Sequence, residues 1–393
     1  MSGPYADMCR DLEATFGPGE PPRLFFAPGR VNLIGAHIDY SGGPVLTASV
    51  DLGTAVVVRR SPVGRWRLAS LNLPERLDGP LHTLPPEPPA SWLAYPLGVL
   101  AVLRGDGHEL PPLDLLVSGS LPIAAGLSSS AALLVALAGG ISALGELGLD
   151  RPALADVAYR AETGYVGVQV GRQDQIAAAL GEPGHVLFID FKTLAWETIP
   201  FPADRLSLVV IDSRTRRQLT AGNYNQRVAE ARGALEKLRA RIPHLTCLAD
   251  LEEGELTRWG TLLTPLEHRR ARHVVSEKAR VLACREALRR GDVEGAGCLL
   301  SLSHHSSRLD YETSTEALDF LQGAALGSGV VFGARLTGGG FGGCVLALSR
   351  AGAEDRVRGT LAPAYERAFG LTPTVHVFRV GPGFHEIPRS AGA

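Results

Sequence analysis

The chain contains 393 residues, 45% of them hydrophobic, which is enough to bury a large core in two domains or in one large domain. Its 39 Lys and Arg nearly balance its 41 Asp and Glu, so the formal net charge of −2 excludes an overall basic field that would attract nucleic acid or an anionic membrane. The five cysteines are scattered and lack metal-ligand spacing, so we expect reduced thiols and a cytoplasmic protein. We find no run of residues typical of a signal peptide or a membrane-spanning helix.

In chain order, the first third predicts a helix, three strands and a second helix. Apolar residues at helical spacing predict the first helix, which a Gly-Pro-Gly sequence ends, and β-branched or alternating residues predict the strands. Trp92 lies in the second helix, after a proline-rich loop, and is expected to anchor the core. The predicted ranges are 4–16 and 91–103 for the helices, 24–27, 45–50 and 54–60 for the strands, and 80–89 for the loop.

A polar segment, residues 28–43, follows the first strand. It combines turn glycines with the guanidinium of Arg30, the imidazole of His37 and the carboxylate of Asp39. Many polar groups close to a strand end are typical of a binding site. An ion pair between Arg30 and Asp39 that only holds a loop is the alternative interpretation.

A small-residue turn, residues 119–132, lies between a predicted strand at 113–117 and a predicted alanine-rich helix at 131–147. Gly126 allows the backbone to approach a ligand closely, and the three serines from Ser128 to Ser130 supply hydroxyls and amides at the helix start. Free N–H groups and the positive end of the helix dipole favour an anion such as phosphate. The turn lacks the Gly-Lys-Ser/Thr ending of a Walker loop, and an ordinary serine N-cap is the alternative.

Two carboxylates lie in the small-residue helices that follow. Glu162 is near the end of a helix predicted over residues 153–164, and Asp174 is at or near the start of another, shortly after Gly171. A carboxylate in a first helical turn can also simply favour the helix dipole, which is the alternative for Asp174. The elements predicted next are strands at 186–190 and 206–212 and arginine-rich helices at 229–241 and 267–289, with solvated charged faces.

A glycine-rich sequence, Thr337 to Cys344, separates the last two predicted strands, at 330–336 and 345–349. So many glycines indicate a backbone that passes very close to something. A sharp β-bulge and a second loop beside a phosphate are the two interpretations.

Three of these sequences, in this order, resemble the galactokinase branch of the GHMP sugar kinases. They are Gly29-Arg30-Val31-Asn32-Leu33-Ile34-Gly35 with His37-Ile38-Asp39-Tyr40, Gly126-Leu127-Ser128-Ser129-Ser130-Ala131, and Thr337-Gly338-Gly339-Gly340-Phe341-Gly342-Gly343-Cys344. Glu162 and the Asp174-Gln175 pair lie between them, where that family keeps a metal-side glutamate and a catalytic Asp-Gln pair. The resemblance covers nearly the whole chain.

The resemblance implies an α+β fold of two domains with the active site between them. The N-terminal domain, residues 1–205, would be of the ribosomal-S5-like α/β type, and the C-terminal domain, residues 206–393, would be ferredoxin-like. The implied reaction transfers the γ-phosphoryl group of MgATP to the anomeric hydroxyl of a hexose, so ATP, Mg²⁺ and a sugar are the expected partners. The oligomeric state is not visible in the sequence, and a monomer is compatible with it.

The resemblance also implies roles for individual residues. Asp174 would be the base or the orienting group for the C1 hydroxyl, and Arg30 would stabilise charge on the attacking and transferring oxygens. Ser130 and Glu162 would bind Mg²⁺. Trp92 would lie near the adenine. The other ATP-binding residues would be Gly126, Leu127, Ser128, Ser129, Ala131, Gly339 and Gly340, and the sugar-binding residues would be Ala36, His37, Asp39, Gly171 and Tyr224.

Ala36 departs from the pattern of family members that use galactose, which have Gly-Glu-His-Thr-Asp-Tyr where this chain has Gly-Ala-His-Ile-Asp-Tyr. That glutamate would bind the sugar 6-hydroxyl and would repel a sugar with a carboxylate at C6. The sequence around Ala36, Leu219-Thr220 and the segment Tyr224 to Val228 are similar to galacturonokinases. We therefore expect D-galacturonate as the substrate, with galactose or N-acetylgalactosamine as alternatives. Candidate cations for a uronate carboxylate are Arg214, Arg216 and Arg217.

Two rival functions come from the same family. A catalytically silent sugar and ATP sensor would have a damaged serine-rich turn or would lack the aspartate, whereas both are present here. A kinase for mevalonate-like or homoserine-like substrates is disfavoured by the sugar-site set of His37, Asp39 and Tyr224.

Overall fold

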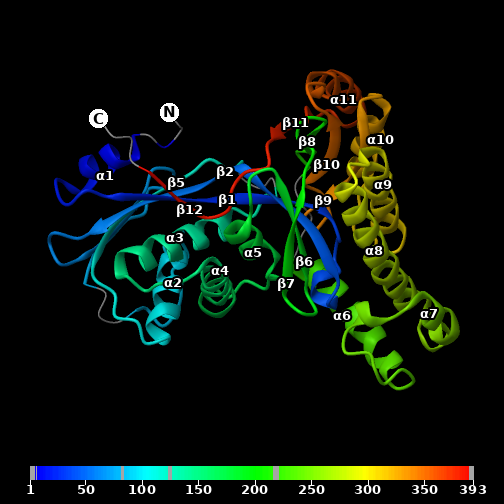
Figure 1. Ribbon diagram of the computed structural model, residues 1–393, viewed down its shortest axis with the longest axis horizontal. Coiled ribbons are helices and arrows are strands. Elements are labelled where there is room, and N and C mark those ends of the chain that lie inside the picture. The colour runs from blue at the N-terminus through cyan, green and yellow to red at the C-terminus, as the bar shows by residue number, and fades with distance from the viewer. Residues whose placement is uncertain (1–4, 6, 81–83, 123–125, 216–220, 389–393) are drawn as a thin grey trace.

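The computed structural model describes residues 5, 7–80, 84–122, 126–215 and 221–388 (Figure 1). The helices are α1 (Met8–Phe16), α2 (Ala94–Gly105), α3 (Ser129–Gly145), α4 (Arg151–Arg160), α5 (Gln173–Leu180), α6 (Ala221–Arg239), α7 (Glu253–Trp259), α8 (Pro265–Arg289), α9 (Val293–Leu309), α10 (Glu316–Gly327) and α11 (Glu354–Phe369). The strands are β1 (Arg23–Ile34), β2 (Pro44–Arg60), β3 (Trp66–Ser70), β4 (Leu77–Gly79), β5 (Leu113–Gly119), β6 (His185–Asp190), β7 (Ala195–Pro200), β8 (Leu206–Asp212), β9 (Val331–Thr337), β10 (Cys344–Arg350), β11 (Thr374–Phe378) and β12 (His385–Ile387).

The strands form two sheets, and helices pack against both, which confirms the α+β class. The first sheet has the order β12-β1-β2-β5-β3-β4, and β6 pairs with β2 and carries β7. The second sheet has the order β11-β8-β10-β9. β8, which begins at Leu206, opens the second sheet, whereas β12 returns to the first and pairs with β1. A domain division after residue 205 stays a prediction.

β1 and β2 are longer than the sequence predicted. β1 continues into the polar segment, and β2 is one strand where two were expected. The pairing of the two strands shifts register twice, which indicates bulges. Gly53 lies opposite Pro28, and a Cβ at Gly53 would come within 2.1 Å of the Ala27 carbonyl oxygen. Glycine therefore carries the strand through a crowded point, and the prediction of a break there was wrong.

Most other predicted elements are present with shifted ends. α1 begins at Met8, and α3 begins at Ser129, two residues before the predicted start. The helix predicted over 153–164 divides into α4 and a π-helical turn, Ala161–Val166, that contains Glu162. A π-helical turn is often found at a functional site. The sequence did not predict β3, β4, β7, β11, β12, α7, α10 or α11.

The first sheet is covered on both faces. Alternate residues of β1 point to opposite faces, so Phe25 and Ala27 join the core beneath α2 to α5 while Leu24 and Phe26 join a smaller core with α1. Figure 1 shows α2 to α5 on one side of this sheet and α1 on the other. α3 is buried along most of its length, as expected for a helix that is apolar all round. The start of α3 is therefore rigidly placed.

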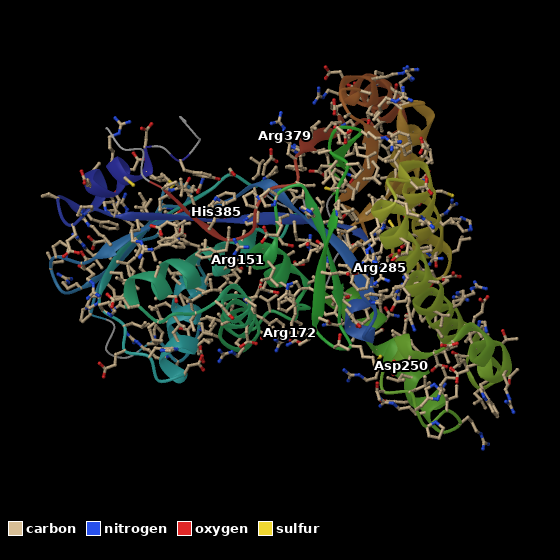
Figure 2. All side chains as sticks on the ribbon, in the orientation of Figure 1. Arg151, Arg172, Asp250, Arg285, Arg379 and His385 are labelled. Atoms are coloured by element: carbon tan, nitrogen blue, oxygen red, sulfur yellow. The ribbon has the colours of Figure 1, made fainter. Side chains whose placement is uncertain are left out.

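β8 separates two further cores, and one of them joins the two halves of the chain. In β8, Val209 and Ile211 pack with α10 and α11, whereas Leu208 and Val210 belong to a core that also contains residues of α8, α9 and the end of β1. Arg285 on α8, labelled in Figure 2, adds a contact at this junction. Its guanidinium carbon lies 4.7 Å from the centroid of the Phe188 ring on β6. Apolar residues of the polar segment 28–43 belong to the same core, so this segment packs against both halves of the chain. No helix in the described parts of the chain is long and apolar enough to cross a membrane.

A buried ion-pair cluster provides a test of the first sheet. Asp114 on β5 is fully buried and lies opposite Arg59 on β2 and Arg67 on β3. It accepts hydrogen bonds from Arg59 Nε at 2.8 Å and from Arg67 Nη2 at 2.6 Å. Asp114→Ala leaves the buried Arg59 without its carboxylate, so we expect the free energy of unfolding, measured in denaturant, to fall by about 3–5 kcal/mol.

The control is Asp106→Ala, which removes one partner of Arg160 from an ion pair near the surface. Exposed pairs contribute little, so the expected loss is below about 1 kcal/mol. Equal losses in the two variants would show that burial of the Asp114 cluster does not determine how much it contributes to the free energy of unfolding.

Candidate active site

A cavity with a volume of about 240 Å³ lies where four segments meet. They are the polar segment 28–43, the loop that precedes α5, the start of α6, and the glycine-rich sequence. The cavity lining contains every residue that the sequence nominated as catalytic or sugar-binding. The lining residues are Arg30, Asn32, Ala36, His37, Asp39, Gln169, Val170, Gly171, Gln173, Asp174, Tyr224, Gly338 and Gly339. Segments more than 300 positions apart in the sequence therefore share one wall.

Arg30 and Asp174 form an ion pair in this cavity. Arg30 Nε donates to Asp174 Oδ1 at 2.7 Å, and Arg30 Nη1 donates to the Gly126 carbonyl oxygen at 2.8 Å. The hydroxyl of Ser128 donates to the other oxygen of Asp174. Asp174 is thus the ion-pair partner of Arg30, and Asp39 is not. The two oxygens of the carboxylate are oriented by donors from β1 and from the serine-rich turn.

The serine-rich turn has a backbone conformation that a plain helix start does not need. Ser128 has a φ of 58° and Gly126 a φ of 71°, both in the left-handed region. A non-glycine residue there carries strain, which is typical of functional turns. The Ser128 side chain makes no capping bond to α3, so the N-cap interpretation was wrong for this residue. Leu127 and Ala131 are buried in the cores, whereas Ser129 is exposed.

Glu162 lies beside this turn and is buried. The hydroxyl of Ser130 and Nε2 of Gln175, at 2.6 Å, both bond to its carboxyl group. Burial raises the pKa of Glu162, and the nearby charge of Asp174 raises it further. Gln175 Oε1 is buried without a hydrogen-bond partner among the described residues. Glu162, Ser130 and Gln175 therefore bring several oxygen atoms together beside the serine-rich turn.

These oxygen donors fit Mg²⁺, which is usually held by one or two carboxylates together with substrate phosphates and water. The described residues contain no group of three His, Cys, Asp or Glu side chains that could hold a metal by themselves. Phosphate oxygens would thus have to complete the coordination of an ion at Glu162 and Ser130.

His37 contributes a wall of the cavity, while its two ring nitrogens are used inside the protein. Nε2 lies 3.0 Å from the Gly339 carbonyl oxygen, and Nδ1 lies 3.0 Å from the Tyr40 hydroxyl. Because a carbonyl only accepts, Nε2 carries the proton and Tyr40 donates to Nδ1. Burial lowers the pKa of His37 to about 3, so the ring is neutral. His37 therefore links the polar segment to the glycine-rich sequence.

Asp39 and Gly171 lie against each other. A Cβ at Gly171 would come within 2.3 Å of Asp39 Oδ2, so the close approach of the carboxylate requires glycine. Burial raises the pKa of Asp39 to about 6, and Asp174 acts in the same direction. Tyr224 completes this side, with its ring centroid 5.5 Å from that of His37.

The glycine-rich sequence contains a tight turn, and its backbone passes very close to the backbone at Thr313. Gly338, Gly340, Gly342 and Gly343 have positive φ, as has Phe341. A Cβ at Gly340 would come within 2.3 Å of the Thr313 carbonyl oxygen, so this glycine is required by protein packing. Gly338 and Gly339 line the cavity, whereas Gly340 does not. Contact of Gly339 and Gly340 with ATP stays a prediction.

Trp92 is a core residue, as expected. It is 7% exposed, and its indole N–H donates to the Glu75 carbonyl oxygen at 3.0 Å. Contact with an adenine stays a prediction. Arg214 is exposed and does not line the cavity. The other sequence candidates for a uronate site, Arg216, Arg217 and Leu219-Thr220, lie outside the described residues.

The structure adds residues that sequence reasoning did not nominate. Asn32, Gln169, Val170, Gln173 and Gly338 also line the cavity. Asn32 and Gly338 lie within the family-like motifs, so their positions could have identified them, whereas Gln169, Val170 and Gln173 carried no clear signal.

α8 also holds the polar segment from behind. Glu277 Oε1 accepts from the Gly35 amide at 2.9 Å and from the Ala36 amide at 3.2 Å, and His273 Nε2 lies 2.9 Å from the Ala36 carbonyl oxygen. Both side chains are fully buried. The backbone at position 36 is thus fixed by the other half of the chain.

The comparisons with known proteins agree with this arrangement. Residues 94–182 match the GHMP kinases N terminal domain and residues 284–366 match the GHMP kinases C terminal domain. Together with the site, these matches define a GHMP kinase. Residues 11–60 match the galactokinase galactose-binding signature.

Relatives narrow the family further. The chain is 35% identical to the galactokinase of Halalkalibacterium halodurans, over 93% of this chain and 92% of the relative. It is 38% identical to that of Roseiflexus sp., over 94% of each. The structure of Lactococcus lactis galactokinase complexed with galactose matches with a TM-score of 0.92 and 32% identity, over 97% of this chain and 99% of that one. The chain belongs to the galactokinase family of the GHMP kinases.

It is accordingly an ATP-dependent sugar kinase, and this family uses ATP with Mg²⁺. The sensor interpretation finds no support in these matches. The mevalonate kinase of Methanococcus jannaschii matches with a TM-score of 0.67 and 17% identity, which shows a shared fold alone.

The pKa of Asp39 gives a pH-dependent prediction for stability. The folded chain holds the Asp39 proton up to about pH 6, whereas the ordinary value is 3.8. Between these values the folded state binds more protons than the unfolded state, so the stability associated with Asp39 is present at low pH and is lost as pH rises through about 6. We expect Asp39→Asn to raise the free energy of unfolding by about 1–3 kcal/mol at pH 7 and to leave it nearly unchanged at pH 4.

Thermal or denaturant unfolding at both pH values measures this difference. Asp204→Asn, at an exposed aspartate, is the control and should change neither. A gain of the same size at pH 4 and pH 7 would rule out the ionised Asp39 as its cause.

Proposed function

We propose that this protein transfers the γ-phosphoryl group of ATP to the anomeric hydroxyl of D-galactose. The observation that carries the proposal is the single cavity in which the Arg30–Asp174 ion pair faces the His37 and Asp39 segment and adjoins the serine-rich turn. A phosphoryl acceptor and the end of a triphosphate would meet at such a junction.

Charge in the cavity supports galactose over galacturonate, the substrate expected from Ala36. The charged lining residues of the described chain are one cation, Arg30, and two carboxylates, Asp39 and Asp174. Arg30 is already paired with Asp174, so a uronate carboxylate would be desolvated beside like charges without a cation of its own. The relatives named above are galactokinases, and one was solved with galactose. Ala36 then leaves room for water at the place of the lost glutamate.

Asp174 and Arg30 would carry the chemistry on the acceptor side. The carboxylate retains lone pairs after binding Arg30 and Ser128, so it can accept the hydrogen of the C1 hydroxyl and direct the oxygen towards the phosphoryl group. Arg30 has no acceptor for its Nη2 among the described residues, so this group can donate to phosphoryl oxygens as charge develops. The anomeric hydroxyl is more acidic than an ordinary alcohol, which reduces the demand on the carboxylate.

The serine-rich turn would hold the donor. We place the triphosphate against residues 126–131, with Ser130 and Glu162 as the protein ligands of Mg²⁺. Bound Mg²⁺ would neutralise phosphate charge and would favour the ionised form of Glu162, whose pKa burial raises. Gln175 orients the Glu162 carboxyl group through its 2.6 Å hydrogen bond.

A parallel assay of sugars tests the proposed substrate. Purified protein with MgATP is expected to phosphorylate galactose with a kcat/KM at least about tenfold above that for galacturonate, because burying a second uncompensated carboxylate costs more than about 1.4 kcal/mol. Glucuronate and N-acetylgalactosamine complete the panel, and the product is checked as an acid-labile 1-phosphate. A tenfold preference for galacturonate would reject galactose as the substrate.

Asp174→Asn tests the role of the carboxylate. The amide keeps the shape of the side chain but loses the charge that orients the hydroxyl, so kcat is expected to fall about 100-fold or more. Binding of ATP, followed by calorimetry, is expected to stay within about threefold of the parent because the substitution leaves the serine-rich turn in place. Near-normal turnover would remove Asp174 from the mechanism.

A further inference from the structure

A buried chain of hydrogen bonds runs from the second sheet to the cavity. Arg335 on β9 is fully buried, and its Nη1 donates to Asn32 Oδ1 at 2.8 Å. Asn32 Nδ2 in turn donates to Gln173 Oε1 at 3.1 Å. Asn32 and Gln173 are each 7% exposed, and both line the cavity beside Asp174.

The guanidinium sets the direction of this chain. Arg335 has only donors, so Asn32 must face it with oxygen and must therefore face Gln173 with its NH2 group. Gln173 can meet that donor only with Oε1. Exchanging oxygen and nitrogen in either amide would place two donors, or two acceptors, against each other. The orientation of Gln173 is therefore determined by chemistry, and its Nε2 is a donor directed by Arg335.

Gln173 Nε2 has no acceptor. It is buried, and no described residue accepts a hydrogen bond from it. A buried donor without a partner is rare in folded proteins and calls for a specific explanation. Arg335 also has unpartnered nitrogens, but Arg335 does not line the cavity, whereas Gln173 lines it and immediately precedes Asp174.

We propose that Gln173 is a sugar-binding residue whose Nε2 donates a hydrogen bond to one hydroxyl oxygen at C2, C3, C4 or C6 of the acceptor sugar, and that Asn32 and Arg335 are positioning residues that aim it. The inference rests on the proposed galactose kinase function. Nε2 is covered by its surroundings, so the bond forms with a small adjustment of the side chain, as is common when a ligand binds. The contact is neutral, and it discriminates between sugars by the presence of one hydroxyl.

Substrate analogues that each lack one hydroxyl test this inference. The four are 2-, 3-, 4- and 6-deoxygalactose, and the quantity measured is the ratio of kcat/KM for galactose to that for each analogue. In the parent protein, loss of the hydroxyl that Gln173 binds raises one of the four ratios, the one for the analogue that lacks this hydroxyl. In Gln173→Met, which keeps the length of the side chain without the amide, we expect that one ratio to fall about tenfold and the other three to stay within about twofold.

Comparing ratios separates the loss of one sugar contact from a general loss of stability or activity. A variant that is merely less stable or less active lowers kcat/KM for galactose and for every analogue together, so its ratios do not change. Gln173→Leu, a smaller apolar residue, provides the same measurement should methionine not fit the site. Gln169→Met, at an exposed glutamine of the same cavity, is the matched control, and the fall in one ratio must exceed any change that it causes.

Asn32→Asp tests the positioning role. An aspartate accepts from both Arg335 and Gln173, so the amide of Gln173 would turn and present oxygen to the cavity. We expect the same single ratio to fall as in Gln173→Met. If Asn32→Asp leaves that ratio unchanged, Asn32 does not aim the amide.

Two outcomes would overturn the inference. One is a Gln173→Met protein whose four ratios all equal those of the parent, which would mean that the amide does not contact the sugar. The other is an equal fall in all four ratios, which no single hydrogen bond can cause. Failure of the proposed function is visible separately, because the parent protein would then not phosphorylate galactose.

Discussion

The ion pair between Arg30 and Asp174 is the contact on which the rest of the site depends. It connects β1 to α5, and the remaining donors around it tie both to the serine-rich turn through Gly126 and Ser128. In the proposed reaction, the acceptor and donor sides would therefore share the carboxylate of Asp174 and the guanidinium of Arg30. A displacement of any of these three segments would alter the position of Asp174, which explains why the turn tolerates a strained φ at Ser128.

Negative charge exceeds positive charge around that pair. Burial raises the pKa of Asp39 and of Glu162, and the charge of Asp174 acts on both pKa values in the same direction. Such an arrangement favours a divalent cation, which would reduce the repulsion, and disfavours a ligand that adds a further negative charge. The absence of a glutamate at position 36 does not reverse this balance, because the cavity remains acidic in the residues that line it.

The C-terminal half contributes to the sugar side by holding backbone and ring groups in place. Glu277 and His273 fix the peptide groups at Ala36, and the Gly339 carbonyl binds the ring of His37. These contacts cross between the halves and are buried, so water does not weaken them. The proposed sugar site is consequently built by both halves, although most of the residues that line the cavity come from the first.

Sequence alone was sufficient to place the chain in its family and in the α+β class. It also nominated more than half of the residues that line the cavity, because glycines at left-handed turns and polar groups at strand ends leave a local pattern. It misjudged β1 and β2, since the irregular pairing that begins after Pro28 and Gly53 resembles a strand end in a sequence. Only the tertiary structure decided the partner of Arg30, the balance of charged residues that line the cavity, and the direction of the Gln173 amide. Each of these depends on groups brought together from distant positions, and local pattern carries no information about such distances.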